Sequence, residues 1–167
     1  VSDGALTGTQ AIAVTVTPQN DNVPDITSNG GGLTASVSVA ENSTAVTTVT
    51  ATDADLPAQT LTYSIAGGSD AARFTIDASS GALAFAVAPN FEAPADANAD
   101  NVYVVLVQVS DGSLVDTQTL SVTVTNANEP PLITSDGGGV TASVGAAENQ
   151  TAVTTVTSSD VDGGASV

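Results

Sequence analysis

Hydrophobic and polar residues alternate along several stretches of this chain. The clearest are 11–17, 102–110 and 119–125, where valine, isoleucine, leucine or tyrosine occupies every second position. A two-residue period of β-branched and aromatic side chains is typical of half-buried β-strands. No segment has the 3.6-residue period of an amphipathic helix. The pattern therefore predicts an all-β protein.

Seven short strands are predicted within the stretch 25–129. They fall at 33–39, 45–52, 61–66, 73–76, 82–87, 102–110 and 117–125. Glycine pairs and triplets, Ser80-Gly81 and a Pro/Asp/Ala-rich stretch at 88–100 separate them, and such residues mark turns. Seven strands in roughly 100 residues predict a Greek-key, seven-stranded β-sandwich of the immunoglobulin-like type.

The chain also repeats part of its own sequence. Val1-Ser-Asp3 returns as Val109-Ser-Asp111, and Ala40-Glu41-Asn42 returns as Ala147-Glu148-Asn149. The period of about 108 residues is the size of a domain. We therefore expect one complete repeat flanked by two partial ones. The predicted boundaries are 1–24 for the tail and linker of a preceding repeat, 25–129 for the complete repeat and 130–167 for the start of a following repeat.

Composition narrows the classes of partner. The chain has one Lys or Arg against 18 Asp and Glu, and its net charge is -17. Nucleic acids and anionic membrane surfaces bind through clusters of basic residues, so neither is an expected partner. No stretch has the roughly 20 apolar residues needed to span a bilayer, so no direct membrane insertion is expected. Cysteine is absent, so stability must come from a core or from a bound metal.

Many of the carboxylates lie where predicted strands end or where repeats join. Of the 18 acidic residues, 11 fall in such recurring positions: Asp3, Asp21, Glu41, Asp53, Asp55, Glu92, Asp111, Glu129, Glu148, Asp160 and Asp162. Like charges held close together repel and require a compensating cation, which the basic side chains cannot supply. Oxygen ligands alone, with no His or Cys, favour Ca²⁺ over zinc or copper, and Mg²⁺ prefers a smaller octahedral site. The sequence therefore predicts calcium binding at both boundaries of the complete repeat.

Six motifs, in the same order, resemble the signatures of cadherin repeats. They are Asn20-Asp-Asn22-Val-Pro24, Ala40-Glu41-Asn42, Asp53-Ala-Asp55, the run from Phe74-Thr-Ile-Asp77 to Gly81-Ala-Leu83, Asn90-Phe-Glu92 and Val109-Ser-Asp111. In cadherins these positions read DxNDNxP, PEN, DxD, FxID with TGxL, LDRE and AxD, and they bind calcium between consecutive domains. The resemblance implies tandem cadherin-like β-sandwiches.

The resemblance also implies a set of ligands for each junction. For the N-terminal junction the set is Asn20, Asp21, the Asn22 carbonyl, Asp53, Asp55 and Asp111. For the C-terminal junction it is Glu41, Glu92, Asn128, Glu129, Asp160 and Asp162. Asn90 replaces the aspartate of LDRE, and the linker 126–131 is one residue shorter than its counterpart, so the two junctions are not expected to be identical. The glycine-rich runs 27–32 and 134–139 resemble cadherin-like repeats of large bacterial surface adhesins.

The function expected from these features is a calcium-rigidified extracellular module for adhesion or surface scaffolding, on a secreted or cell-surface protein. One alternative is a carbohydrate-binding module that recognises a surface glycan. Another is homophilic assembly into filaments, in which residues 1–17 of one chain complement residues 133–167 of a second chain. An enzyme is not expected, because His and Cys are absent and Arg73 is the lone basic residue. The aspartates outside the motifs, including Asp70, Asp96 and Asp116, are expected to solvate loops.

Overall fold

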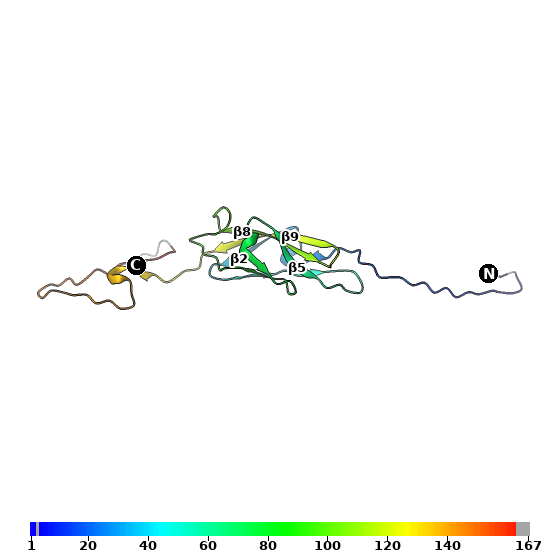
Figure 1. Cartoon of the computed structure of the whole chain (residues 1–167), viewed down its shortest axis with the longest axis horizontal. Helices are drawn as coiled ribbons and strands as arrows, with labels where there is room; N and C mark the ends of the chain where they lie inside the picture. Colours follow the sequence, from blue (N-terminus) through cyan, green and yellow to red (C-terminus); the bar gives the residue numbers. More distant parts are fainter. Residues whose placement is uncertain (3, 163–167) are drawn as a thin grey trace.

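The computed structural model describes residues 1–2 and 4–162. The molecule is elongated, with a β-domain at its centre and the two ends of the chain extending from opposite poles (Figure 1). The described residues form strands and three 3₁₀ turns, at Ser28–Gly30, Ala71–Arg73 and Ser135–Gly137, and they contain no α-helix. The prediction of an all-β protein is confirmed.

The central domain consists of two facing sheets. One has the strand order β2-β9-β8-β5, and the other has the order β3-β7-β6. The bounds are β2 Thr34–Ala40, β3 Ala45–Thr48, β5 Thr62–Gly67, β6 Phe74–Ile76, β7 Ala82–Phe85, β8 Val102–Ser110 and β9 Val115–Thr125. Strand β2 runs parallel to β9, whereas β9 and β8 are antiparallel. Buried residues alternate with half-buried ones along β8, as the two-residue period predicts.

A short pair of strands, β1 (Asp25–Ile26) and β4 (Ala51–Thr52), closes one end of the domain. The strand predicted at 45–52 is therefore divided into β3 and β4. Between them the Val49 N–H donates to the Gly81 carbonyl (2.8 Å), and the Thr50 carbonyl accepts from Thr27. At these contacts the chain changes its pairing partner, from β7 for β3 to β1 for β4.

The core is built around three aromatic rings. Phe74 and Phe85 are stacked with centroids 4.7 Å apart, and Tyr103 meets the Phe85 ring edge-on at 5.1 Å. All three are at most 5% exposed, as expected from their places on predicted strands. Aromatic pairs of this geometry add to the stabilisation from burial. Aliphatic residues from both sheets surround the rings, mainly valines of β8 and β9.

Three aspartates expected to solvate loops are instead structural. Asp70 is 4% exposed and accepts N–H groups from Ala97 (2.7 Å) and Val104 (2.8 Å). Asp96 is 8% exposed and accepts the N–H groups of residues 100 and 101. The Asp116 carboxylate accepts the Ile26 N–H at 2.9 Å. Charged acceptors bonded to backbone N–H groups are tolerated in buried positions, and these hold loop 88–101 and β1 in place.

The beginning of the complete repeat is reproduced after the second linker. Strands β10 (Leu132–Ile133) and β11 (Ser158–Ser159) pair as β1 and β4 do. Asp136 has the same left-handed backbone as Asn29, with φ values of 52° and 53°. The internal repetition of sequence is therefore accompanied by repetition of local structure.

Gly81 offers a direct test of this packing. Its φ is +71°, and a Cβ added there would lie 2.1 Å from the Val49 carbonyl oxygen. We expect Gly81→Ala to lower the free energy of unfolding by about 3 kcal/mol, because a clash with backbone adds to left-handed strain. Denaturant unfolding measures this effect. The matched control is Gly112→Ala, at φ +101° with nothing within 4 Å of the added Cβ, where strain alone costs about 1 kcal/mol. Equal effects of the two substitutions would show that the contact with Val49 is not tight.

Candidate metal centres

Three carboxylates come together where the first linker reaches the domain. The N-terminal cluster consists of Asp53, Asp55 and Asp111, each of which offers an oxygen within 4.8 Å of the others. Asp53 and Asp55 follow β4, and Asp111 follows β8. The Asp55 N–H donates to Asp53 Oδ1 (2.8 Å), which fixes the first pair. The ends of β4 and β8, which belong to different sheets, thus place the three carboxylates at one pole.

The first linker is bonded directly to this cluster. The backbone N–H groups of Asp21 and Asn22 donate to Asp55 Oδ2 at 3.1 and 3.0 Å. The side-chain amide oxygen of Asn20 faces the same group, 3.3 Å from Asp55 Oδ2 and 3.0 Å from Asp111 Oδ2. Acceptor oxygens placed this close are stable if the amide turns over to donate its N–H, or if a cation lies among them. The linker and the cluster therefore form one polar site.

Hydrogen bonds favour the ionised forms of Asp55 and Asp111 in this cluster. The side-chain N–H of Asn22, followed by the backbone N–H groups of residues 22 and 21, lowers the pKa of Asp55 against the opposing effect of burial. Backbone N–H groups of Leu114 and Ser113 lower the pKa of Asp111. A carboxylate that accepts several N–H groups is favoured in its charged form. Both groups therefore carry negative charge at neutral pH.

Four carboxylates meet at the opposite pole. The C-terminal cluster consists of Glu41, Glu92, Glu129 and Asp162, whose oxygens also lie within 4.8 Å of one another. They come from the end of β2, loop 88–101, the second linker and the turn after β11. Glu41 is 3% exposed. One cluster thus joins the complete repeat to both the linker and the following segment.

Backbone groups hold the C-terminal cluster in place. Glu41 accepts the N–H of Phe91 (2.8 Å) on one oxygen and that of Ala127 (2.9 Å) on the other. The Glu129 N–H donates to Asp162 Oδ2 at 2.7 Å. At the N-terminal junction, two successive linker N–H groups donate to the equivalent carboxylate, Asp55. At the C-terminal junction, the residue after Glu129 is Pro130, which has no N–H to donate. The two junctions therefore differ, as the linker sequences predict.

Several carboxylate oxygens in the two clusters are buried and have no hydrogen-bond partner. They are Asp53 Oδ2, Glu129 Oε2 and Asp162 Oδ1. A buried unpaired acceptor costs about 1–3 kcal/mol, and more when it is charged. Such atoms are expected where a cation completes the site. The donor set, all carboxylate and amide oxygen with no His or Cys in the chain, fits a hard cation such as Ca²⁺.

The raised pKa of Glu129 in the C-terminal cluster also favours a bound cation. Burial raises the pKa of Glu129, and the charges of Glu41, Asp162 and Glu92 raise it further, although the Asn42 amide opposes them. A carboxylate whose pKa rises in the folded state is destabilising when ionised. A cation among these four groups would remove that penalty.

Not every residue of the predicted ligand sets lies in a cluster. Asn128 is exposed, and its amide N–H donates to the Glu129 carbonyl (3.2 Å). Asp160 supports Asp162 by accepting its N–H (3.0 Å), as Asp53 supports Asp55. The Asp21 side chain is exposed, although its backbone bonds to the N-terminal cluster.

Two residues that hold the C-terminal cluster were not predicted. Asn42 donates to Glu129 Oε1, and Asn126 donates to Glu92 Oε1 (2.8 Å). The role of Asn42 could have been predicted, because Asn42 follows Glu41 in a motif that the chain repeats. Nothing in the sequence distinguishes Asn126 from the other linker asparagine.

The profile of the cadherin domain matches residues 35–125. The chain belongs to the cadherin family. The stretch 35–125 includes most of both cadherin sheets, and it carries Glu41, Glu92 and the N-terminal cluster. The resemblance inferred from the six motifs is therefore confirmed.

Mammalian cadherins are among the relatives of this cadherin chain. Human cadherin EGF LAG seven-pass G-type receptor 2 is 36% identical over 124 residues, which cover 74% of the chain and 4% of that protein. Mouse protocadherin Fat 4 is 36% identical over 132 residues, which cover 76% of the chain and 2% of that protein. The chain thus spans only a small part of these relatives.

Solved cadherin structures have the same fold. The chain superposes on the extracellular domain of protocadherin GammaB4 with a TM-score of 0.54, at 27% identity, covering 71% of the chain and 19% of that structure. For mouse cadherin-23 EC22-24 the TM-score is 0.53, at 28% identity, and the match covers 66% of the chain and 33% of that structure.

As a cadherin domain, the chain is an extracellular, adhesion-type module, which confirms the location expected from the sequence. Within its described part, no helix has the length and apolar character needed to cross a bilayer.

Proposed function

We propose that this chain is a calcium-rigidified segment of a tandem cadherin array, which serves adhesion or surface scaffolding. The observation that carries the proposal is the position of the two clusters. Each cluster has a linker bonded to it, and the two linkers leave the domain at opposite poles, as the backbone in Figure 1 shows. Domains whose junctions both bind cations can form a stiff rod.

The chain's own residues supply the coupling between linker and domain. At the N-terminal junction, Asp55 receives two backbone N–H groups from the linker. At the C-terminal junction, Glu41 receives the Ala127 N–H, while Asp162 receives that of Glu129. A bound Ca²⁺ would supply the positive charge and the multiple oxygen coordination that these carboxylates lack. The linkers then lose the freedom to bend, because their backbone is fixed to carboxylates that the ion holds together.

Calcium binding can be tested at each junction separately. Extracellular modules typically bind with a Kd of roughly 10⁻⁴ to 10⁻³ M. We expect calorimetric titration of the chain to give binding in this range, with Asp55→Asn weakening the N-terminal site and Asp162→Asn weakening the C-terminal site at least tenfold. Glu148→Gln is the control, because Glu148 is exposed and belongs to neither cluster. Equal loss of binding in all three variants would point to general charge neutralisation and would contradict the proposed sites.

The pocket lined by Phe85, Val87 and Tyr103 does not favour a carbohydrate-binding function. Sugar recognition relies on exposed aromatic faces. The two aromatic residues that line this pocket, Phe85 and Tyr103, are 3% and 2% exposed. Strand complementation between chains remains a separate proposal for self-assembly. It is supported by the exposure of Ile12, Val14 and Val16, which are 77–85% exposed.

A further inference from the structure

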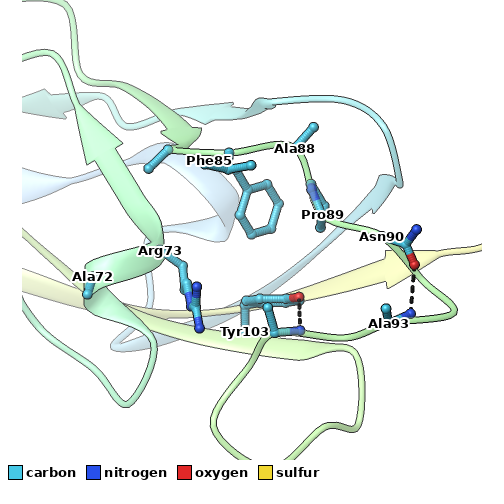
Figure 2. Close-up of a pocket in the computed structure, with 11 residues that line it drawn as sticks. Ala72, Arg73, Phe85, Ala88, Pro89, Asn90, Ala93 and Tyr103 are labelled. Atoms are coloured by element: carbon cyan, nitrogen blue, oxygen red, sulfur yellow. Dashed lines mark hydrogen bonds between the residues drawn. The ribbon is translucent and has the colours of Figure 1, made fainter.

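A small hollow lies beside the end of β7, and none of its lining residues belongs to either carboxylate cluster. Its volume is about 260 Å³. The turn before β6, the segment 85–90, loop residues 93 and 95 and the start of β8 enclose it. In Figure 2, Arg73 and Pro89 lie on opposite sides of this space, with the Phe85 ring and Tyr103 between them.

The walls of this pocket are apolar. The buried ring of Phe85 and buried Pro89 form part of the lining, together with Val87 and several alanine side chains. Asn90 also lines the pocket, but its side-chain oxygen accepts the Ala93 N–H at 2.6 Å (Figure 2). The lining therefore favours a ligand with an apolar body.

Arg73 gives the pocket its charge. It is the one Lys or Arg in a chain with 18 Asp and Glu. Within the described residues its guanidinium forms no ion pair and no hydrogen bond. Asp70 and Asp96, which line a neighbouring hollow together with Arg73, already accept backbone N–H groups. The five N–H donors of the guanidinium are therefore available to a ligand.

Tyr103 adds a second donor. Its hydroxyl oxygen accepts the Ala95 N–H at 3.0 Å (Figure 2), while the structure gives the hydroxyl hydrogen no acceptor within the described residues. Tyr103 is 2% exposed, so this hydrogen is shielded from bulk water. Buried tyrosine hydroxyls normally find a partner, which makes an acceptor in the pocket favourable.

We propose that this pocket binds a small carboxylate carried on a short apolar stem. The carboxylate would pair with the Arg73 guanidinium, and the stem would lie against the exposed side chains of Ala86, Val87 and Ala88. The volume lies below the 300–1,000 Å³ of drug-sized sites, which favours a small free molecule. Arg73 supplies one positive charge to this pocket, which matches a ligand with a single negative charge.

Nuclear magnetic resonance tests this proposal. Because the chain has one arginine, its Nε–H gives one signal that reports on the site. The probe is 4-methylpentanoate, titrated in calcium-free buffer so that it cannot bind through a metal. We expect saturable shifts of the Arg73 Nε–H and of the Tyr103 ring. The uncharged analogue 4-methylpentanamide should bind at least tenfold more weakly, because it loses the charge-assisted hydrogen bonds.

Two variants separate the two parts of the site. Arg73→Gln should weaken binding of the acid at least tenfold while leaving the weak binding of the amide unchanged. Ala88→Leu, at an exposed lining position, should block both compounds by filling the pocket. The proposal is overturned if no saturable shift occurs at tens of millimolar probe, if acid and amide bind equally, or if the shifts fall at the Val1 amino group instead of Arg73.

Discussion

We expect millimolar calcium to raise the melting temperature of this chain by on the order of 10 °C and to stiffen the connection between the linkers and the domain. At ten times its Kd, an ion that binds only the folded state stabilises it by about 1.4 kcal/mol. One ion at each cluster would contribute about 3 kcal/mol, and a domain of about 100 residues gains roughly 4–8 °C for each kcal/mol. Calorimetry measures the first effect. Small-angle scattering measures the second, as a narrower distribution of end-to-end distances.

The control for this experiment separates specific binding from screening. Sodium at equal ionic strength also weakens repulsion among the carboxylates, since the Debye length falls as salt is added. It cannot coordinate several oxygens at 2.3–2.6 Å as Ca²⁺ does. If sodium reproduces the increase in melting temperature, or if chelation of calcium leaves the scattering profile unchanged, the clusters are ordinary acidic surface and the rod proposal is wrong.

The longer strands of this fold could be predicted from the sequence. A strand of several residues shows the two-residue alternation of hydrophobic and polar positions, and buried and half-buried residues alternate along the whole of β8 as expected. Strand β1 has two residues and is too short to show an alternating pattern, so it could not be predicted in this way. The division of the predicted strand at Val49 depends on a hydrogen bond to Gly81, more than 30 residues away, for which a local pattern carries no signal.

Several carboxylates of the two candidate sites could be expected from the sequence because the chain repeats them. Asp53 and Asp55 alone are typical of a solvated turn, whereas their return as Asp160 and Asp162 indicated a shared role. In the structure both pairs adopt the same arrangement, in which the first aspartate accepts the N–H of the second. Repetition within one sequence thus carried information that a single motif lacks.

The buried aspartates were missed for a physical reason. Asp70 and Asp96 are bonded to backbone N–H groups, which every non-proline residue possesses. No side-chain pattern marks such a partner, so an aspartate in a predicted loop gives no sign of whether it faces solvent or anchors the loop. The same limit applies to Asn126, whose amide supports Glu92.

Substitution of Glu41 should have the largest effect of any single change at the C-terminal junction. Glu41 is 3% exposed, and its two oxygens accept the Phe91 and Ala127 N–H groups. Glu41→Gln replaces one of these acceptors with an NH₂ group that faces a donor. With calcium bound we expect a loss of about 3 kcal/mol or more in the free energy of unfolding, since a hydrogen bond to a charged group is lost together with a ligand of the ion.

The calcium-free protein distinguishes the two causes of this loss. Without the ion, removing one of four neighbouring charges relieves repulsion on Glu129, whose pKa is raised partly by Glu41. That relief offsets the lost hydrogen bond, so the variant and the parent should differ less without calcium than with it. The increase in melting temperature caused by calcium should fall by about half, because the N-terminal cluster is intact. Glu148→Gln is the matched control, since Glu148 occupies the position equivalent to Glu41 in the following segment and is exposed. Equal destabilisation of the Glu41 variant with and without calcium would assign Glu41 a purely structural role.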